Sequence, residues 1–435
     1  MDPVTYSPIL ALALFLLLGT GVWVALSLIG VAYVAMLMFS NAPISAVMPT
    51  TIWSSLSTWT LTALPLFIWM GEILFRTRLS SDLFQGLAPW VNRLPGRLTH
   101  VNVLGCGIFA AVSGSSAATA ATVGQMSLPE LDKRGYDNSL SIGSLAASGT
   151  LGLLIPPSII LIVYGVSVNV SIGRLFLAGV IPGLVLMGLF VGYIAVWSLI
   201  NRSKMPPPEP ALPWREALYR VRLLLPIICL IVVVIGSIYA GIATATEAAT
   251  LGVVGSLIIA KISGGLTRES FFKSLFGATR TSCMIAFILA GAAFLTTAMG
   301  FSGIPRALAL WIDAMDLSPY ALLLALMLLY LVLGCFLDGI SMVVLSTSVV
   351  MPMVQQAGID LIWFGIFLTI MVEIAQITPP VGFNLFVVQG ITDRDIFYIA
   401  KAVLPFFLLM LLMILLLTLY PAMATWLPTT MMSPR

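Results

Sequence analysis

The sequence predicts an all-α polytopic membrane protein made of two inverted repeats, each with a re-entrant hairpin and a discontinuous helix. Hydrophobic residues fill 60% of the 435 positions and charged residues only 9%, whereas a soluble domain has about 25% charged residues. The apolar runs are long, and at roughly 20 residues per spanning helix their total length allows about ten to twelve crossings. Polar breaks and prolines recur at matching places in the two halves, which predicts the repeats.

The first half contains both uninterrupted and interrupted apolar runs. The uninterrupted runs predict helices near 8–25, 26–41, 59–75 and 175–200. Residues 100–133 predict a hairpin that enters and leaves on one side, because a polar run at 113–116 divides them. Residues 139–169 predict a helix broken at Pro156 and Pro157, since proline lacks the N–H that a helix interior needs.

The second half follows the same plan. Its uninterrupted runs predict helices near 223–242, 244–260, 281–300 and 399–420. Residues 319–357 predict a second hairpin, divided by the polar residues 338–341. Residues 361–390 predict a second broken helix, interrupted at Thr378-Pro379-Pro380.

Six residues of types that interrupt or end helices recur with one constant displacement of 223 positions. Pro129, Gly135, Asp137, Pro156, Pro157 and Pro182 have counterparts at Pro352, Gly358, Asp360, Pro379, Pro380 and Pro405. A single displacement without a gap indicates an internal duplication, with 1–200 and 223–435 as the two repeats. Residues 201–222 form the longest polar stretch and predict a cytoplasmic linker between them.

The positions of the basic residues predict the orientation. If the N-terminus lies outside and each half crosses an odd number of times, all but three of the 20 Lys and Arg lie inside, the exceptions being Arg174, Arg306 and Arg435. The second half then starts inside, so the repeats are inverted and both termini are on the outer side. Three amphipathic segments, at 80–97, 266–280 and 303–316, are expected along the membrane interfaces.

The polar breaks predict a binding site at mid-membrane depth, because unwound backbone there persists only where it is buried in protein or lines a cavity. The prolines leave four carbonyls without their helical partners, those of Gly152, Leu153, Ala375 and Gln376. Carbonyl oxygens suit a hard cation such as Na⁺, and the hydroxyls and helix N-terminal N–H groups of the hairpin tips suit a carboxylate. The pattern therefore predicts joint binding of an anion and a cation.

The candidate substrate ligands lie at the hairpin tips and beside the breaks. They are Ser113, Gly114, Ser115, Ser116, Ser158, Asp338, Ser341 and Asn384. Small and hydroxylated residues also occur where membrane helices cross closely, so a structural role stays open for any single break. Among the carboxylates, Glu373 precedes Thr378 by about one turn and is favoured as part of the site, Glu247 is expected to be hydrogen-bonded structurally, and Glu72 stays open.

Several classes of protein are excluded by what the sequence lacks. No phosphate-binding G-x-x-x-x-G-K-[ST] motif occurs, so the chain itself does not hydrolyse a nucleotide. One histidine and four widely spaced cysteines do not make a metal centre or a nucleophilic catalytic group. We expect no enzymatic activity and no nucleic-acid partner.

Motifs along nearly the whole chain resemble one transporter family. The segments AAVSGSSAATAATVGQMSLPELDKRGYD, GTLGLLIPPSIILIVYG, GCFLDGISMVVLSTSVVMP and ITPPVGFNLFVVQG resemble, in this order, the large membrane subunit of the tripartite ATP-independent periplasmic (TRAP) transporters. The resemblance implies an elevator-type, Na⁺-driven importer of organic acids in the bacterial inner membrane. It also implies two partners, a periplasmic solute-binding protein and a small four-helix membrane subunit.

The resemblance also implies the sodium ligands. They fall on Ser113, Ser115, Gly152, Ile155 and Pro157 in the first half, and on Gly339, Ala375, Thr378 and Val381 in the second half. Gly339 stands where many relatives have proline. A glycine there would loosen the tip of the second hairpin.

An elevator implies a moving body. We expect 100–170 and 319–390 to move together against 8–75, 175–260 and 281–300, with hinges near Gly173, Gly179 and 390–395.

Two other classes of protein stay open. One is a stand-alone carboxylate permease with the same fold, and the other is an ion channel, which would need polar residues along whole helices.

Overall fold

The computed structural model describes residues 3–207, 213–303, 307, 318–380 and 382–431, and within these ranges the chain is helical without strands. The first-half helices are α1 (Pro3–Gly19), α2 (Val24–Phe39), α3 (Ile44–Leu56), α4 (Ala63–Phe75), α5 (Leu79–Val91), α6 (His100–Ser113), α7 (Ser116–Lys133), α8 (Asn138–Gly149), α9 (Ile159–Val168) and α10 (Ile172–Ile200). Short 3₁₀ turns are η1 (Trp59–Thr62), η2 (Arg97–Thr99), η3 (Thr150–Leu153) and η4 (Arg202–Lys204).

The second-half helices are α11 (Trp214–Val221), α12 (Leu225–Tyr239), α13 (Ala245–Ile262), α14 (Arg268–Ser302), α16 (Pro319–Gly334), α17 (Gly339–Gln356), α18 (Leu361–Gln376), α19 (Phe383–Thr392), α20 (Ile396–Leu419) and α21 (Ala422–Met431). Their bounds support the duplication, because α7 and α17 both begin and end 223 residues apart. The hairpins α6–α7 and α16–α17 and the broken helices α8–α9 and α18–α19 occur where the sequence predicts them. Both breaks contain a cis Pro-Pro bond, Pro156-Pro157 and Pro379-Pro380.

Five described helices are long and apolar enough to cross a bilayer alone, or up to seven spans result if each of two bent pairs counts as one. This number is below the roughly ten to twelve crossings expected from hydrophobic length. One reason is that the hairpins and broken helices divide apolar sequence into shorter helices, which supply four of the five described apolar helices with 10–17 residues; the fifth is α2.

Three features differ from the predicted elements. Helix α3 was not predicted because its serines, threonines and Pro49 lower its apolar content; it joins η1 and α4 at a bend of 56°. Helix α21 was not predicted either. The segment 266–280 is not a separate interfacial piece, since α14 continues through it without a break. The predicted segment 303–316 lies almost wholly outside the described residues.

The linker between the repeats is packed against the first half. Helix α11 lies along α5, and the Trp90 and Trp214 rings meet edge to face with centroids 5.2 Å apart. The Arg93 guanidinium lies 4.8 Å from the centre of the Trp214 ring, and Arg97 Nη1 donates to Pro206 O at 2.5 Å. These contacts anchor the predicted cytoplasmic linker 201–222 to the helix that leads into the first hairpin.

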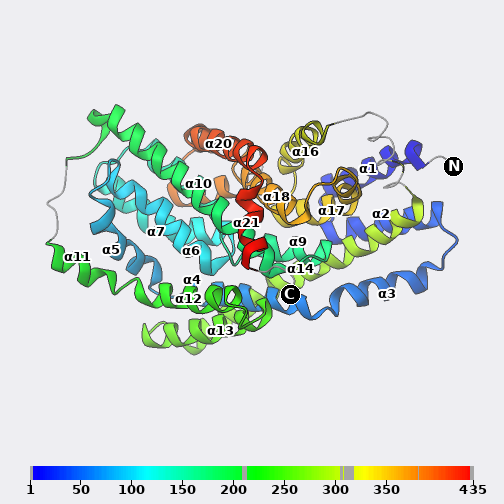
Figure 1. Ribbon diagram of the computed structural model, residues 1–435, viewed down its shortest axis with the longest axis horizontal. Helices are drawn as coiled ribbons and strands as arrows, with labels where there is room; N and C mark the ends of the chain where they lie inside the picture. The colour runs from blue at the N-terminus through cyan, green and yellow to red at the C-terminus, as the bar shows by residue number, and fades with distance from the viewer. Residues whose placement is uncertain (1–2, 208–212, 304–306, 308–317, 381, 432–435) are drawn as a thin grey trace.

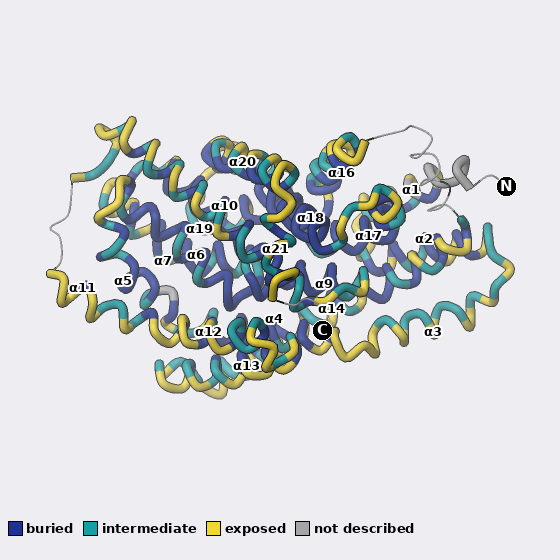
Figure 2. The backbone as a smooth tube through the Cα atoms, in the orientation of Figure 1, coloured by how far each residue is buried: buried dark blue, intermediate teal, exposed yellow. Residues whose placement is uncertain are grey.

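The helices form a frame around a central group. The frame consists of α1–α4 and α12–α14, in which α14 packs against α2, α3 and α4. The central group consists of α6–α9 and α16–α19, and its helices lie in the middle of the elongated molecule, with α3 and α11 towards its ends (Figure 1). Figure 2 shows most of the central helices buried, whereas α3, α11 and α13 are largely exposed.

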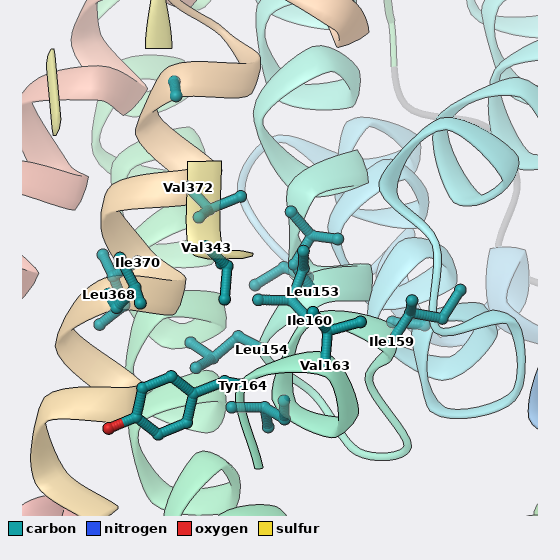
Figure 3. Packing of buried hydrophobic residues seen from close by; sticks show 14 of the residues in the cluster. Leu153, Leu154, Ile159, Ile160, Val163, Tyr164, Val343, Leu368, Ile370 and Val372 are labelled. Atoms are coloured by element: carbon teal, nitrogen blue, oxygen red, sulfur yellow. The ribbon is translucent and has the colours of Figure 1, made fainter. Parts of the chain in front are cut away.

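Each hairpin packs on the broken helix of the opposite half. Helix α7 lies along α19, and α17 lies along α9, so the two halves exchange partners at the centre. Figure 3 shows Leu153, Leu154 and Ile160 of the first half beside Val343 and Val372 of the second. This exchange joins the hairpins and broken helices into one packed group.

Helix α10 packs against the central group, and the expectation that 175–200 belongs to the stationary part stays a prediction. A Cβ on Gly179 would lie 2.6 Å from Leu154 O, so glycine allows α10 to touch the broken helix directly. Likewise, a Cβ on Gly143 of α8 would lie 2.2 Å from Ala402 O of α20. Of the expected hinge positions, Gly173 lies in the first turn of α10 and Gly179 lies farther along the same helix.

Candidate functional site

The tip of the first hairpin brings three oxygen atoms together. Ser115 caps α7 by accepting from Ala118 N, and Thr119 Oγ1 donates to Ser115 O at 2.7 Å. Because the single hydrogen of Thr119 is used in that bond, Ser113 Oγ, 2.7 Å from Thr119 Oγ1, acts as the donor between the two hydroxyls. Thr119 was not predicted, although its position four residues after Ser115 places it on the same face of the helix.

Gly152 of the broken helix lies against this group of oxygens. A Cβ at Gly152 would lie 2.8 Å from Ser115 O and 2.9 Å from Thr119 Oγ1, so any side chain would displace them. Three of the predicted sodium ligands, Ser113, Ser115 and Gly152, are therefore brought together. We call Ser113, Ser115, Thr119 and Gly152 the first oxygen cluster. The oxygen atoms of this cluster are uncharged, and uncharged oxygens are among the ligands that bind a hard cation.

The remaining first-half candidates hold the tip against the break. Gly114 has φ +60°, and a Cβ there would lie 2.8 Å from Pro157 O, so a glycine is needed both for conformation and for space. Ile159 N donates to Gly114 O at 3.3 Å. The Ile155 side chain points towards Gly107 and Gly183 on α6 and α10, away from the tip, so it can offer only its backbone to an ion.

Ser158 serves the backbone of the broken helix. Its Oγ accepts from Leu161 N at 3.2 Å, which caps α9, and donates to Leu153 O. The Leu153 carbonyl, predicted to lose its helical partner, is therefore satisfied by a side chain across the break. This bond removes Leu153 O from the set of free carbonyls near Gly152.

Asp338 caps the second hairpin helix. Its Oδ2 accepts from Ile340 N at 3.1 Å and from Ser341 N at 3.4 Å, and its Oδ1 accepts from Ser341 Oγ. The break itself lies at 335–338, so it shares only Asp338 with the polar residues 338–341 that predicted it. The N–H groups expected to meet a substrate carboxylate thus already face a carboxylate of the protein.

Close backbone packing brings the second hairpin onto α18. A Cβ at Gly334 would lie 2.3 Å from Ala375 Cβ, and one at Gly339 would lie 2.5 Å from Val372 Cγ1 and 3.2 Å from Gln376 Nε2. Ala375 O accepts from Thr378 N at 3.2 Å, and Thr378 Oγ1 donates to Ile374 O at 2.7 Å. Gly339 therefore contacts α18 at Val372 and Gln376, Thr378 bonds back to Ala375 on the same helix, and Val381 lies outside the described residues.

A hydrogen-bonded chain joins the halves beside the first tip. Ser116 Oγ donates to Asn384 Oδ1 at 2.6 Å, and Asn384 Nδ2 donates to Ala146 O at 3.1 Å. All three groups are buried. Asn384 of α19 thus reaches the first hairpin, a contact between two predicted substrate ligands that lie 268 positions apart in sequence.

The three carboxylates have different surroundings. Glu247 accepts from Thr244 N at 2.7 Å in a capping box at the start of α13, which confirms its structural role. Glu72 pairs with Arg76 at 2.9 Å. Glu373 is fully buried, and neither carboxylate oxygen has a hydrogen-bond partner among the described residues. The described part of the chain contains no group of three or more His, Cys, Asp or Glu suited to a metal ion.

Known proteins are similar to this chain in sequence, and others are similar to it in fold. Residues 9–423 match the family described as "Tripartite ATP-independent periplasmic transporter, DctM component". The chain is 33% identical, over 98% of both chains, to the C4-dicarboxylate TRAP transporter large permease protein DctM of Vibrio cholerae. It is 31% identical to the ectoine TRAP transporter large permease protein TeaC of Halomonas elongata, over 84% of this chain and 86% of that protein.

Among solved structures, the YdaH transporter of Alcanivorax borkumensis is similar in fold. The TM-score is 0.65 at 14% sequence identity, and the match covers 96% of this chain and 99% of that one. At this identity the likeness concerns the arrangement of the helices alone.

Proposed function

This chain belongs to the DctM family of tripartite ATP-independent periplasmic transporters as a large permease subunit, and we propose that it couples the inward movement of Na⁺ to import of an organic acid. The first oxygen cluster is the observation that supports this coupling. Its uncharged oxygens come from the hairpin tip and face Gly152 in the 3₁₀ turn η3, just before the break of the broken helix. An ion bound there would tie the hairpin to the broken helix.

We further propose that the substrate is a small organic acid delivered by a periplasmic binding protein, in a complex with a small membrane subunit in the inner membrane. The names of two relatives support a small polar solute, since they refer to C4-dicarboxylates and to ectoine. The packed exchange of hairpins between the halves supports an elevator, because hairpins and broken helices joined in this way move as one body.

Import is expected to require Na⁺, and Thr119→Val is expected to raise the half-saturating Na⁺ concentration about tenfold. The substitution keeps the side-chain shape but removes an oxygen that faces the proposed ion. We take the loss of this contact to be comparable to the loss of a hydrogen bond to a charged group, about 1.5–3 kcal/mol. The measurement is solute uptake by proteoliposomes containing the three-component transporter, with Na⁺ varied at constant ionic strength.

Thr122→Val is the matched control, because Thr122 lies one turn later on α7 and its buried hydroxyl has no hydrogen-bond partner among the described residues. It is expected to keep the Na⁺ dependence of the unmodified protein. Uptake at full rate in Na⁺-free buffer, driven by a proton gradient alone, would contradict the proposed coupling ion.

A further inference from the structure

A cavity of about 460 Å³ lies between the frame and the central group, bounded by α3, α9, α14 and α17. Hydroxyl groups dominate its polar lining, among them Thr51, Ser54, Thr296, Thr297, Thr347 and Ser348. None of the described residues that line it is Asp, Glu, Lys, Arg or His. A solute in this cavity would therefore meet many hydrogen-bonding groups and no charged side chain.

Most hydroxyls of the lining already use their hydrogen within their own helix. Thr297 donates to Ala293 O at 3.0 Å, and Thr347 donates to Val344 O at 3.1 Å. Ser54 and Ser167 make the same kind of bond. A hydroxyl has one hydrogen and two lone pairs, so what remains available at these oxygens is their capacity to accept. The hydroxyls of the lining thus present acceptors to a solute, whereas the amide groups of Asn169 and Gln355 are the lining side chains that can also donate.

The cavity also lies on the boundary between the two groups of helices. Thr296 Oγ1 of α14 in the frame lies 2.8 Å from Ser348 Oγ of α17 in the second hairpin, and the two hydroxyls form one bond across the boundary. A second cavity of about 560 Å³ shares Thr58, Val166 and Asn169 with the first and continues around the end of α9. Arg174, one of the few basic residues predicted on the outer side, follows that end of α9 closely in the chain.

We propose that the cavity between α3, α9, α14 and α17 is an outer vestibule that binds the solute before the central group moves, and that it recognises hydroxyl groups of the solute. The acceptors of the lining hydroxyls favour a solute that also donates hydrogen bonds, whereas a carboxylate offers only acceptors and could be bound by the amides of Asn169 and Gln355 but not by these hydroxyls unless they broke their helical bonds. The preferred substrate is then a hydroxylated organic acid. This inference rests on the proposed import function, and it adds that the permease itself recognises the hydroxyl groups of the solute.

The test removes single acceptors without changing shape. Thr297→Val and Thr347→Val are each expected to raise the KM for a hydroxylated acid about fivefold, the value of one neutral hydrogen bond, with the maximal uptake rate unchanged. Thr279→Val is the matched control, because Thr279 is on the same helix as Thr297 and makes the same bond to the carbonyl four residues earlier, but it is exposed outside the cavity. Its uptake kinetics are expected to equal those of the unmodified protein.

Uptake by the reconstituted three-component transporter is measured for pairs of acids that differ by one hydroxyl, malate with succinate and lactate with propionate. The best-carried pair is then used with the variants, and the rise in KM should be confined to the hydroxylated member. Unchanged KM values in both variants would overturn the vestibule, and equal losses for both members, or uptake of the member without the hydroxyl alone, would overturn the recognition of hydroxyls. Failure of the unmodified transporter to take up any organic acid, in these pairs or in a wider panel, would overturn the proposed import function itself.

Discussion

A disulfide between Thr296→Cys and Ser348→Cys is expected to stop transport completely. The two hydroxyl oxygens lie 2.8 Å apart, so the sulfur atoms that replace them would meet in the same place. Thr296 belongs to the frame and Ser348 to the second hairpin, which the proposed elevator requires to move past the frame. Uptake is compared in oxidised proteoliposomes and after reduction with dithiothreitol, which should restore it.

The control is a cysteine pair inside the frame. A Cβ at Gly252 of α13 would lie 3.6 Å from Met70 Cγ of α4, which is where the sulfur of Met70→Cys would stand, so Met70→Cys with Gly252→Cys allows a disulfide between two frame helices. Oxidation of this pair is expected to leave uptake unchanged. The locked Thr296–Ser348 pair should still show stabilisation by Na⁺ on heating, because the first oxygen cluster lies within the central group. Normal uptake in the locked protein would mean that the site is static and that local gating moves the solute.

Gly152→Ala is expected to lower Na⁺ affinity by about a hundredfold or more and to remove Na⁺-driven uptake at ordinary Na⁺ concentrations. The added methyl group would lie 2.8 Å from Ser115 O and 2.9 Å from Thr119 Oγ1, so both oxygens must shift away. Losing two oxygen contacts to a cation, at about 1.5–3 kcal/mol each, gives this magnitude. The loss of Na⁺-driven uptake is measured in proteoliposomes, and the loss of Na⁺ affinity is measured separately by the Na⁺-dependent rise in Tm.

Gly188→Ala is the matched control for this substitution. Gly188 lies within α10, and a Cβ there would have no atom within 4 Å. Alanine is favoured over glycine in a helix by about 1 kcal/mol, so Tm should stay the same or rise. If Gly152→Ala behaved like Gly188→Ala, the contact with the hairpin tip would have no part in ion binding.

The positions of the breaks could be predicted because local chemistry determines them. A proline at 156, 157, 379 or 380 removes a helical N–H whatever surrounds it, and Ser115 and Asp338 cap the next helix with their own side chains. The duplication is visible for the same reason, since each repeat carries its own copy of these local signals. Helix α3 was not predicted because its polar composition resembles that of a loop, and its packing against α14 stabilises it.

The grouping of these breaks into sites depends on tertiary packing. Thr119 is one of several threonines and serines in the first hairpin, and it is distinguished by its bonds to Ser113 and Ser115 at the tip and by the approach of Gly152 from another helix. The same holds for Asn384, which meets Ser116 across the two halves, and for Gly179, whose contact with Leu154 O places α10 beside the broken helices. Sequence alone determined the family, the repeats and the breaks, since these depend on residues near one another in the chain. The tertiary structure decided which oxygens face each other and which helices lie together, because those contacts depend on how well distant side chains and glycines fit.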